Sequence, residues 1–204
     1  MVKYVFHYLN VRGLGECARL ILHYAGCEFE DHRMEFAELN KDELPFGKVP
    51  VLEVDGKKLP ESFAINRYLA KQTGLGGSDD FESAEIDSIA YLWKDFLDAI
   101  LPFILVVMGR RKGDKEQMRE EHLNPALNHY IPIFERLLKE SDNGYLHSSG
   151  LSWADFFASN ITFNCRKFMP DDINKHQTLI DHCDRVHSLP RVNDYVANRP
   201  DTSF

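Results

Sequence analysis

Two short segments have the residue types of an edge that binds a small, peptide-like molecule. Pro50 follows Val49 where a predicted strand would need a backbone N–H, so this proline needs an explanation. A cis Val49–Pro50 bond in a tight turn is one such explanation. It would turn the N–H and C=O of Val49 outward, free to pair with the backbone of a ligand. Glu61 and Ser62, a polar pair at the start of a predicted helix, complete this edge.

Tyr8 is the best candidate for a catalytic group. It ends a predicted strand over residues 3–9, and the alternation of side chains along a strand puts Tyr4, Phe6 and Tyr8 on one face. Two interpretations follow from this position. Tyr8 is either a third core aromatic or, at the carboxyl edge of the strand, a hydroxyl directed into a site.

Other candidate motifs are better explained without special chemistry. Residues 13–18 (GLGECA) mimic a dinucleotide fingerprint, but such a unit needs further parallel βα repeats, and here a short hairpin follows. We therefore expect these glycines to permit close helix–strand packing and the approach of a ligand, and Cys17 to be a buried structural thiol. The nine histidines lack the spacing and the acidic neighbours of a zinc site, so no metal is predicted.

Composition excludes several classes of protein. The net charge of the 204 residues is −8, which argues against general nucleic-acid binding because that requires basic surfaces. The four widely spaced cysteines and the absence of a signal-peptide pattern predict a cytoplasmic protein with reduced thiols. The apolar run at residues 100–108 is too short to span a membrane.

The order of predicted elements indicates a thioredoxin-like α/β domain followed by an all-α domain. Strands over 3–9 and 28–34 flank a helix over 12–25, and Asp55-Gly56 joins a hairpin of 51–54 and 57–59 that leads to a helix over 62–73. Turn-forming residues at 75–80 suggest a linker. The remainder is predicted to be helical, at 81–108, 115–140, 152–168, 176–187 and 191–198.

The whole chain resembles a glutathione S-transferase of the sigma class, close to the nematode members and related to vertebrate haematopoietic prostaglandin D synthase. Five motifs in order carry this resemblance: Tyr8 with Arg12-Gly13-x-Gly15-Glu16-x-x-Arg19, Pro45-Phe46-Gly47-Lys48-Val49-Pro50-Val51-Leu52, Glu61-Ser62-x-Ala64-Ile65-x-Arg67-Tyr68-Leu69, Ser152-Trp153-Ala154-Asp155, and Arg199-Pro200-x-Thr202-x-Phe204.

The resemblance implies a glutathione-binding domain at residues 1–74, a linker at 75–80, a helical domain at 81–204 that completes the electrophile site, and a homodimer. Tyr8 would donate a hydrogen bond to the glutathione sulfur and favour the thiolate. Many sigma-class members have Gln at the position of Glu61. The residues expected to bind glutathione are Tyr8, Lys41, Lys48, Val49, Pro50, Glu61, Ser62 and the partner subunit's Asp95.

The implied reaction is conjugation of the glutathione thiolate to apolar electrophiles, as in detoxification. Leu14 replaces an arginine of the vertebrate synthase, so a roomier, more apolar pocket is expected. Its expected residues are Leu9, Gly13, Leu14, Ile104, Val107, Met108, Phe157, Ile161 and Phe204. The alternatives are a prostaglandin-H2 D-isomerase, a ligandin-like carrier of haem or fatty acids with little catalysis, and a lens-crystallin-like structural protein.

Overall fold

The structure, a computed structural model, describes residues 2–202 and divides into two compact units. Within the described residues, unit 1 comprises 2–76 together with 187–202, and unit 2 comprises 77–186. This division differs from the predicted one at the C-terminal end of the chain, which clusters with the N-terminal unit. Contacts between residues far apart in sequence account for the difference: Arg12 Nη1 donates to the backbone oxygen of Thr202 at 2.9 Å, and Arg199 Nη1 to Glu16 Oε1 at 2.7 Å.

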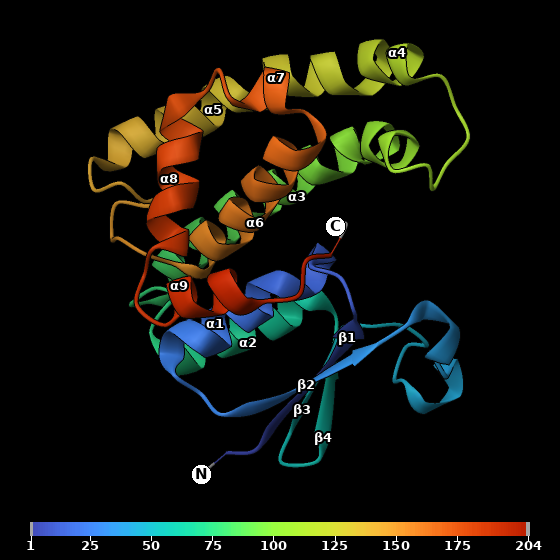
Figure 1. Cartoon of the computed structure of the whole chain (residues 1–204). Coiled ribbons are helices and arrows are strands. Elements are labelled where there is room, and N and C mark those ends of the chain that lie inside the picture. Colours follow the sequence, from blue (N-terminus) through green and yellow to red (C-terminus); the bar gives the residue numbers. More distant parts are fainter. Residues whose placement is uncertain (1, 203–204) are drawn as a thin grey trace. The chain divides into compact units, whose positions relative to one another are not determined.

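Unit 1 contains a four-stranded mixed sheet in the order β2-β1-β3-β4 (Figure 1). β1 (Tyr4–Leu9) runs parallel to β2 (Phe29–Met34) and antiparallel to β3 (Val51–Val54), which in turn pairs with β4 (Lys57–Pro60). The predicted hairpin is confirmed, with positive φ at both Asp55 (49°) and Gly56 (83°), as a tight two-residue turn requires. The thioredoxin-like topology is therefore confirmed.

Helices of unit 1 pack on one face of this sheet. The first, α1 (Glu16–Ala25), buries Leu20, Ile21 and Leu22, and Gly26 ends it in the left-handed conformation at φ 66°. α2 (Ser62–Thr73) packs beside α1, and α9 (Val192–Asn198) also contacts α1. Three short 3₁₀ turns complete the unit: η1 (Gly13–Gly15), η2 (Phe36–Glu38) and η3 (Lys41–Glu43).

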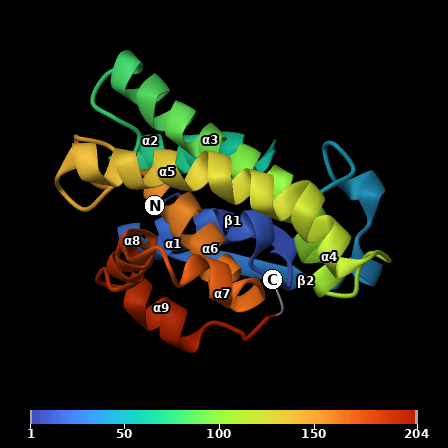
Figure 2. The same ribbon diagram turned by 90° about the horizontal axis from the view of Figure 1, so that it is seen from above.

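Unit 2 is helical. The long helix α3 (Asp80–Val107) packs along α6 (Trp153–Phe168) and α5 (Asn124–Ser141) (Figure 2). Its core includes Trp93 stacked on Phe134 with 3.7 Å between ring centroids. The remaining helices are α4 (Lys115–Met118), α7 (Pro170–Ile173) and α8 (Gln177–His187). No helix within residues 2–202 is long and apolar enough to cross a membrane.

Two details of unit 2 differ from the prediction. A π-helical turn, η4 (Arg119–Leu123), interrupts the single helix predicted at 115–140. Pro125 has no N–H to bond to the carbonyl four residues before it, which favours a local change of hydrogen-bond pattern. The short helix α7 was not predicted. A capping box of Ser152 and Asp155 begins α6: Asp155 Oδ2 accepts bonds from the Ser152 N–H at 2.8 Å and hydroxyl at 3.0 Å.

Candidate functional site

Strand register gathers the predicted polar residues at one end of the sheet of unit 1. His7 pairs with Val51, and Val51 pairs with Pro60. The residues next to these pairs, at the end of β1, just before β3 and just after β4, must therefore lie close together at the same end of the sheet. They are Tyr8 at the end of β1, Val49-Pro50 before β3, and Glu61-Ser62 after β4.

Tyr8 is both a buried aromatic and a directed hydroxyl. Its side chain is only 8% exposed, and its ring stacks on Phe6 at 6.3 Å between centroids. The hydroxyl oxygen accepts a hydrogen bond from the Leu14 N–H at 3.0 Å, so it points to the turn after β1. The oxygen thus takes one backbone donor and keeps its own proton to donate elsewhere.

The two glycines of η1 leave room for the Tyr8 ring. A Cβ atom at position 13 would lie 2.6 Å from the Tyr8 hydroxyl, and one at position 15 only 2.3 Å from Cδ1 of the ring. Gly13 also has a positive φ of 40°. The expected role of these glycines in close helix–strand packing is confirmed.

Burial controls the ionisation of Tyr8. Loss of solvent raises the pKa of the Tyr8 phenol, while the Leu14 N–H and the nearby Arg19 guanidinium act in the opposite direction and are weaker. The phenol therefore remains protonated at neutral and moderately alkaline pH. A protonated phenol is a hydrogen-bond donor, which is the form needed to stabilise an anion in front of it.

Arg19 supports this region from α1. Its carbon Cζ lies 5.6 Å from the centroid of the Tyr8 ring, and its nitrogens donate to the backbone oxygens of Leu9 (3.3 Å) and Val11 (2.8 Å). Asp31 and Glu16 balance its charge at 3.0 and 3.4 Å. In the sequence, Arg19 stood out only as part of the first motif. The signal for its role was an arginine three residues after Glu16 in a helix whose other inward residues are apolar.

The Val49–Pro50 peptide bond is cis, as predicted. Within residues 2–202, the backbone N–H and C=O of Val49 have no hydrogen-bond partner, and the residue is half-buried. The open backbone edge inferred from the sequence is therefore present. A peptide-like ligand can pair with it in the manner of an added strand.

The start of α2 lies beside this edge. Glu61 has φ 74° and ψ 120°, a conformation that is rare for a residue with a side chain, and no side chain caps the helix. Ser62 is 7% exposed, and its hydroxyl has no partner in the described part of the chain. Lys48 Nζ lies 3.3 Å from Glu61 Oε1. An uncapped helix start with a free hydroxyl is suited to a carboxylate.

The remaining predicted site residues lie in several places. Lys41 is exposed at the start of η3, with its Cβ near Gly47, and Leu9 and Leu14 are half-buried around the turn after β1. In unit 2, Asp95 is exposed on α3, while Ile104, Phe157 and Ile161 are buried core residues. Val107 and Met108 are half-buried at the end of α3. Phe204 lies outside the described residues. Cys17 is fully buried, and burial raises the pKa of its thiol well above the ordinary range.

The chain is similar to known proteins over nearly its whole length. Residues 4–71 match the glutathione S-transferase N-terminal domain, and residues 97–199 match the C-terminal domain. Glutathione S-transferase 1 of Ascaris suum is 37% identical, with both chains fully covered. Monomeric Na-GST-3 from Necator americanus, a glutathione S-transferase of known structure, is 38% identical, covers 100% of this chain and 99% of its own, and has a TM-score of 0.91. Prostaglandin synthase D of Nilaparvata lugens is 34% identical, with 98% and 100% covered and a TM-score of 0.87.

Proposed function

The chain belongs to the glutathione S-transferase family, and on this premise we propose that it is a Tyr-type, sigma-like transferase in which Tyr8 activates glutathione. The single observation that best supports the proposal is the convergence at one sheet end of a directed phenol, an open backbone edge and an uncapped helix start. These three features correspond to the thiol, the peptide backbone and the terminal carboxylate of a tripeptide.

The tripeptide would bind in an extended form along the edge before β3. Val49 would exchange backbone hydrogen bonds with the cysteinyl residue. Ser62 and the start of α2 would hold the γ-glutamyl carboxylate, with the helix dipole favouring its charge. Glu61 would accept from the γ-glutamyl ammonium group, and Lys48 and Lys41 would attract the glycyl carboxylate. Pro50 shapes the turn that presents Val49.

Tyr8 would supply the chemistry by donating its proton in a hydrogen bond to the sulfur. A bond to the charged form favours that form, so the thiol would lose its proton to solvent near neutral pH. The thiolate would then attack an electrophilic carbon to form a C–S bond. In a substitution, the bond from carbon to the leaving group breaks and its electron pair departs with that group. In an addition, the neighbouring carbon takes a proton from water.

Retention on immobilised glutathione, followed by assays of the eluate, tests this proposal. We expect the protein to bind, to elute with free glutathione, and to conjugate apolar aryl halides and unsaturated carbonyl compounds. The same preparation should turn over prostaglandin H2 weakly. Specific conversion of prostaglandin H2 would instead favour the isomerase, for which the Nilaparvata lugens relative is the supporting observation. Tight haem or fatty-acid binding without conjugation would favour a carrier.

A homodimer is the proposed assembly, with the partner subunit's Asp95 reaching the ammonium group of glutathione. Asp95 is exposed on α3, and its neighbour Lys94 pairs with Asp98 at 2.7 Å, so the Asp95 carboxylate is available. Light scattering measures the mass of the assembly in solution. Asp95→Asn should weaken glutathione binding where the protein is a dimer and should leave it unchanged where the protein is a monomer, because Asp95 would act on the glutathione of the other subunit. Detoxification in the cytoplasm is the proposed setting.

A further inference from the structure

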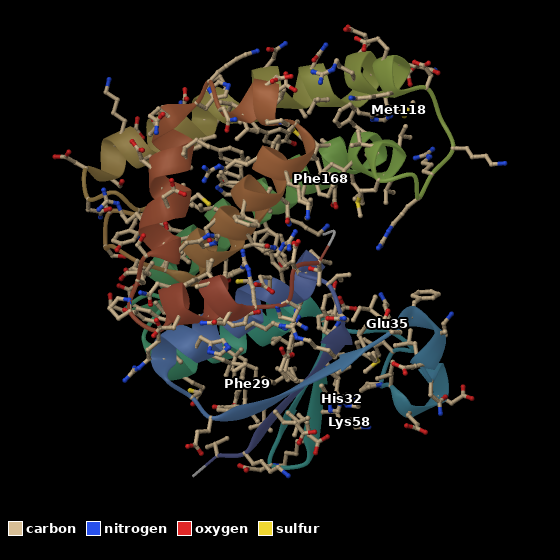
Figure 3. The ribbon with its side chains drawn as sticks, in the orientation of Figure 1. Phe29, His32, Glu35, Lys58, Met118 and Phe168 are labelled. Atoms are coloured by element: carbon tan, nitrogen blue, oxygen red, sulfur yellow. The ribbon has the colours of Figure 1, made fainter. Side chains whose placement is uncertain are left out.

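The face of the sheet opposite to α1 and α2 carries a pocket of about 430 Å³. Side chains alternate along β1, so His7 points away from the face on which Phe6 meets Arg19 of α1. His7, His32 and Lys58 line this pocket, and the segment after β2 contributes Glu38 and Glu43. Figure 3 shows His32 and Lys58 on this side of the sheet. None of the residues proposed to bind glutathione lines it.

Two of the residues that line this pocket are histidines in direct contact. His7 and His32 are direct neighbours in the register of the parallel strands β1 and β2. Their Nδ1 atoms lie 3.1 Å apart, and their rings meet edge to face with 5.1 Å between centroids. His32 is exposed, whereas His7 is half-buried. The pair therefore rests on two hydrogen-bonded strands, which fix its spacing, and it is open to solvent on the His32 side.

Glu53 determines which nitrogen of His7 carries the proton. Nε2 of His7 is buried, has no hydrogen-bond partner among residues 2–202, and faces Glu53 Oε2 at 3.6 Å. A carboxylate in this position favours a proton on Nε2 and leaves the lone pair on Nδ1. Nδ1 of His7 thus accepts a hydrogen bond from Nδ1–H of His32. Carboxylates behind histidines serve this same orienting role in metal sites.

The spacing suits a metal ion between the two rings. With Zn–N bonds of 2.0–2.1 Å and tetrahedral angles, two ligating nitrogens lie about 3.3 Å apart. The observed separation is within a few tenths of an ångström of this value. Small ring rotations would aim both lone pairs at one ion. The proton on Nδ1 of His32 would leave, and the other nitrogen of this exposed ring would take one from solvent.

We propose that His7 and His32 bind a divalent transition-metal ion of the zinc and copper class on the outer face of the sheet. Imidazole pairs prefer these ions over magnesium or calcium. Within the described chain, no set of three or more His, Cys, Asp and Glu side chains has metal-ligand spacing, so water fills the other coordination positions.

Neighbouring charges are compatible with this ion. Glu53 faces His7 at 3.6 Å, and Glu38 and Glu43 line the same pocket as the pair. The one lysine of the pocket, Lys58, donates from Nζ to the backbone oxygen of Glu43 at 3.0 Å. The Arg33 guanidinium bonds to Asp31 at 2.7 Å and to Tyr195 at 3.1 Å, so its charge is already compensated.

Calorimetric titration of ZnCl₂ into untagged, chelator-treated protein tests the proposal. The wild type should bind one ion per chain at this site, and His32→Asn should bind it at least tenfold more weakly. His32 is exposed, so this variant should fold normally, and thermal unfolding verifies that. His129→Asn removes an exposed histidine of α5 and should bind zinc as the wild type does.

Two further variants sharpen the test. His7→Asn should abolish the same binding, and Glu53→Gln should weaken it about tenfold because it removes only the orienting carboxylate. Cu²⁺ bound to the wild type should show coupling to two imidazole nitrogens in its electron paramagnetic resonance spectrum. Equal zinc affinity of the wild type and His32→Asn would overturn the proposal, as would the absence of zinc binding at millimolar concentration.

Discussion

Replacing Tyr8 with Phe removes the hydroxyl that faces the proposed sulfur position and leaves the ring in place. The ring is buried, and among residues 2–202 the hydroxyl makes one hydrogen bond, from the Leu14 N–H at 3.0 Å. Tyr8→Phe should therefore fold, with a loss of about 1 kcal/mol in the free energy of unfolding. The loss of activity should depend on pH, because the hydroxyl acts on the ionisation of the glutathione thiol.

The size of the effect follows from the strength of one hydrogen bond to a charged group. Such a bond contributes about 1.5–3 kcal/mol, and each pKa unit corresponds to about 1.36 kcal/mol. The thiol, with an ordinary pKa of about 8.5, would then titrate roughly one to two units lower in the wild type than in the variant. At pH 6.5 the bound thiolate should fall about 10- to 50-fold in the variant, whereas at pH 9.5 the two proteins should agree within about 20%.

The expected agreement between the wild type and Tyr8→Phe at pH 9.5 depends on the environment of Tyr8. Burial raises the pKa of its phenol, so the hydroxyl still donates at pH 9.5 and the wild type does not lose its own donor there. Ultraviolet difference absorbance of the bound thiolate measures the ionisation directly, and kcat/KM for an aryl halide should follow it at low pH.

Tyr4→Phe is the matched control. Tyr4 lies on the same strand and face, is equally buried at 8% exposure, and hydrogen-bonds to Tyr68 away from the site. It should leave the pKa of the bound thiol unchanged. A defect of Tyr8→Phe that is equally large at pH 6.5 and 9.5, or a thiol pKa identical to that of the wild type, would refute the assigned role of Tyr8.

Three other perturbations follow from contacts described above. Gly15→Ala places a Cβ 2.3 Å from the Tyr8 ring. The free energy of unfolding, measured by urea denaturation, should therefore fall by about 1–3 kcal/mol, and activity should fall with it. Wild-type stability and activity would contradict this close packing. Asp155→Ala removes the acceptor of the Leu146 and Ser152 N–H groups and the partner of buried His182 at 2.9 Å. The free energy of unfolding should fall by about 3–5 kcal/mol. The control Asp181→Ala, at an exposed position, should change it little. Burial lowers the pKa of both His7 and His23, with His32 adding to the effect on His7. On acidification through pH 6.5 the unfolded chain therefore takes up protons first, and the free energy of unfolding should fall between pH 7 and 5.5. His7→Gln should make the free energy of unfolding fall less over this pH range. An unchanged pH dependence in this variant would contradict the role assigned to His7.

Local sequence patterns were sufficient to predict most of the fold and the sheet end at which the candidate site lies. Asp55-Gly56 specified a hairpin, and that hairpin aligns Val51 with Pro60, which places Val49-Pro50 and Glu61-Ser62 at the same end of the sheet. The capping residues Ser152 and Asp155 located the start of α6. In each case the physical signal lies within a few residues, where turn geometry and capping hydrogen bonds act.

Features set by distant residues were not predictable in the same way. No local pattern indicates that Arg199 bonds to Glu16 or that Arg12 bonds to Thr202, because each pair is separated by more than 180 residues. The His7–His32 contact likewise depends on strand register, which brings together two residues that appeared solvated or structural when each was considered alone.

The discontinuous course of unit 1 has a consequence for synthesis of the chain. Residues 2–76 leave the ribosome before unit 2, but Glu16 receives its arginine partner only after residue 199, which follows unit 2, has been made. At about 5–20 residues per second, the 126 residues from 77 to 202 take roughly 6–25 s to make. Unit 2, continuous in sequence, can complete its core during that interval. The nascent protein thus assembles the middle of its sequence before the first segment acquires its last contacts.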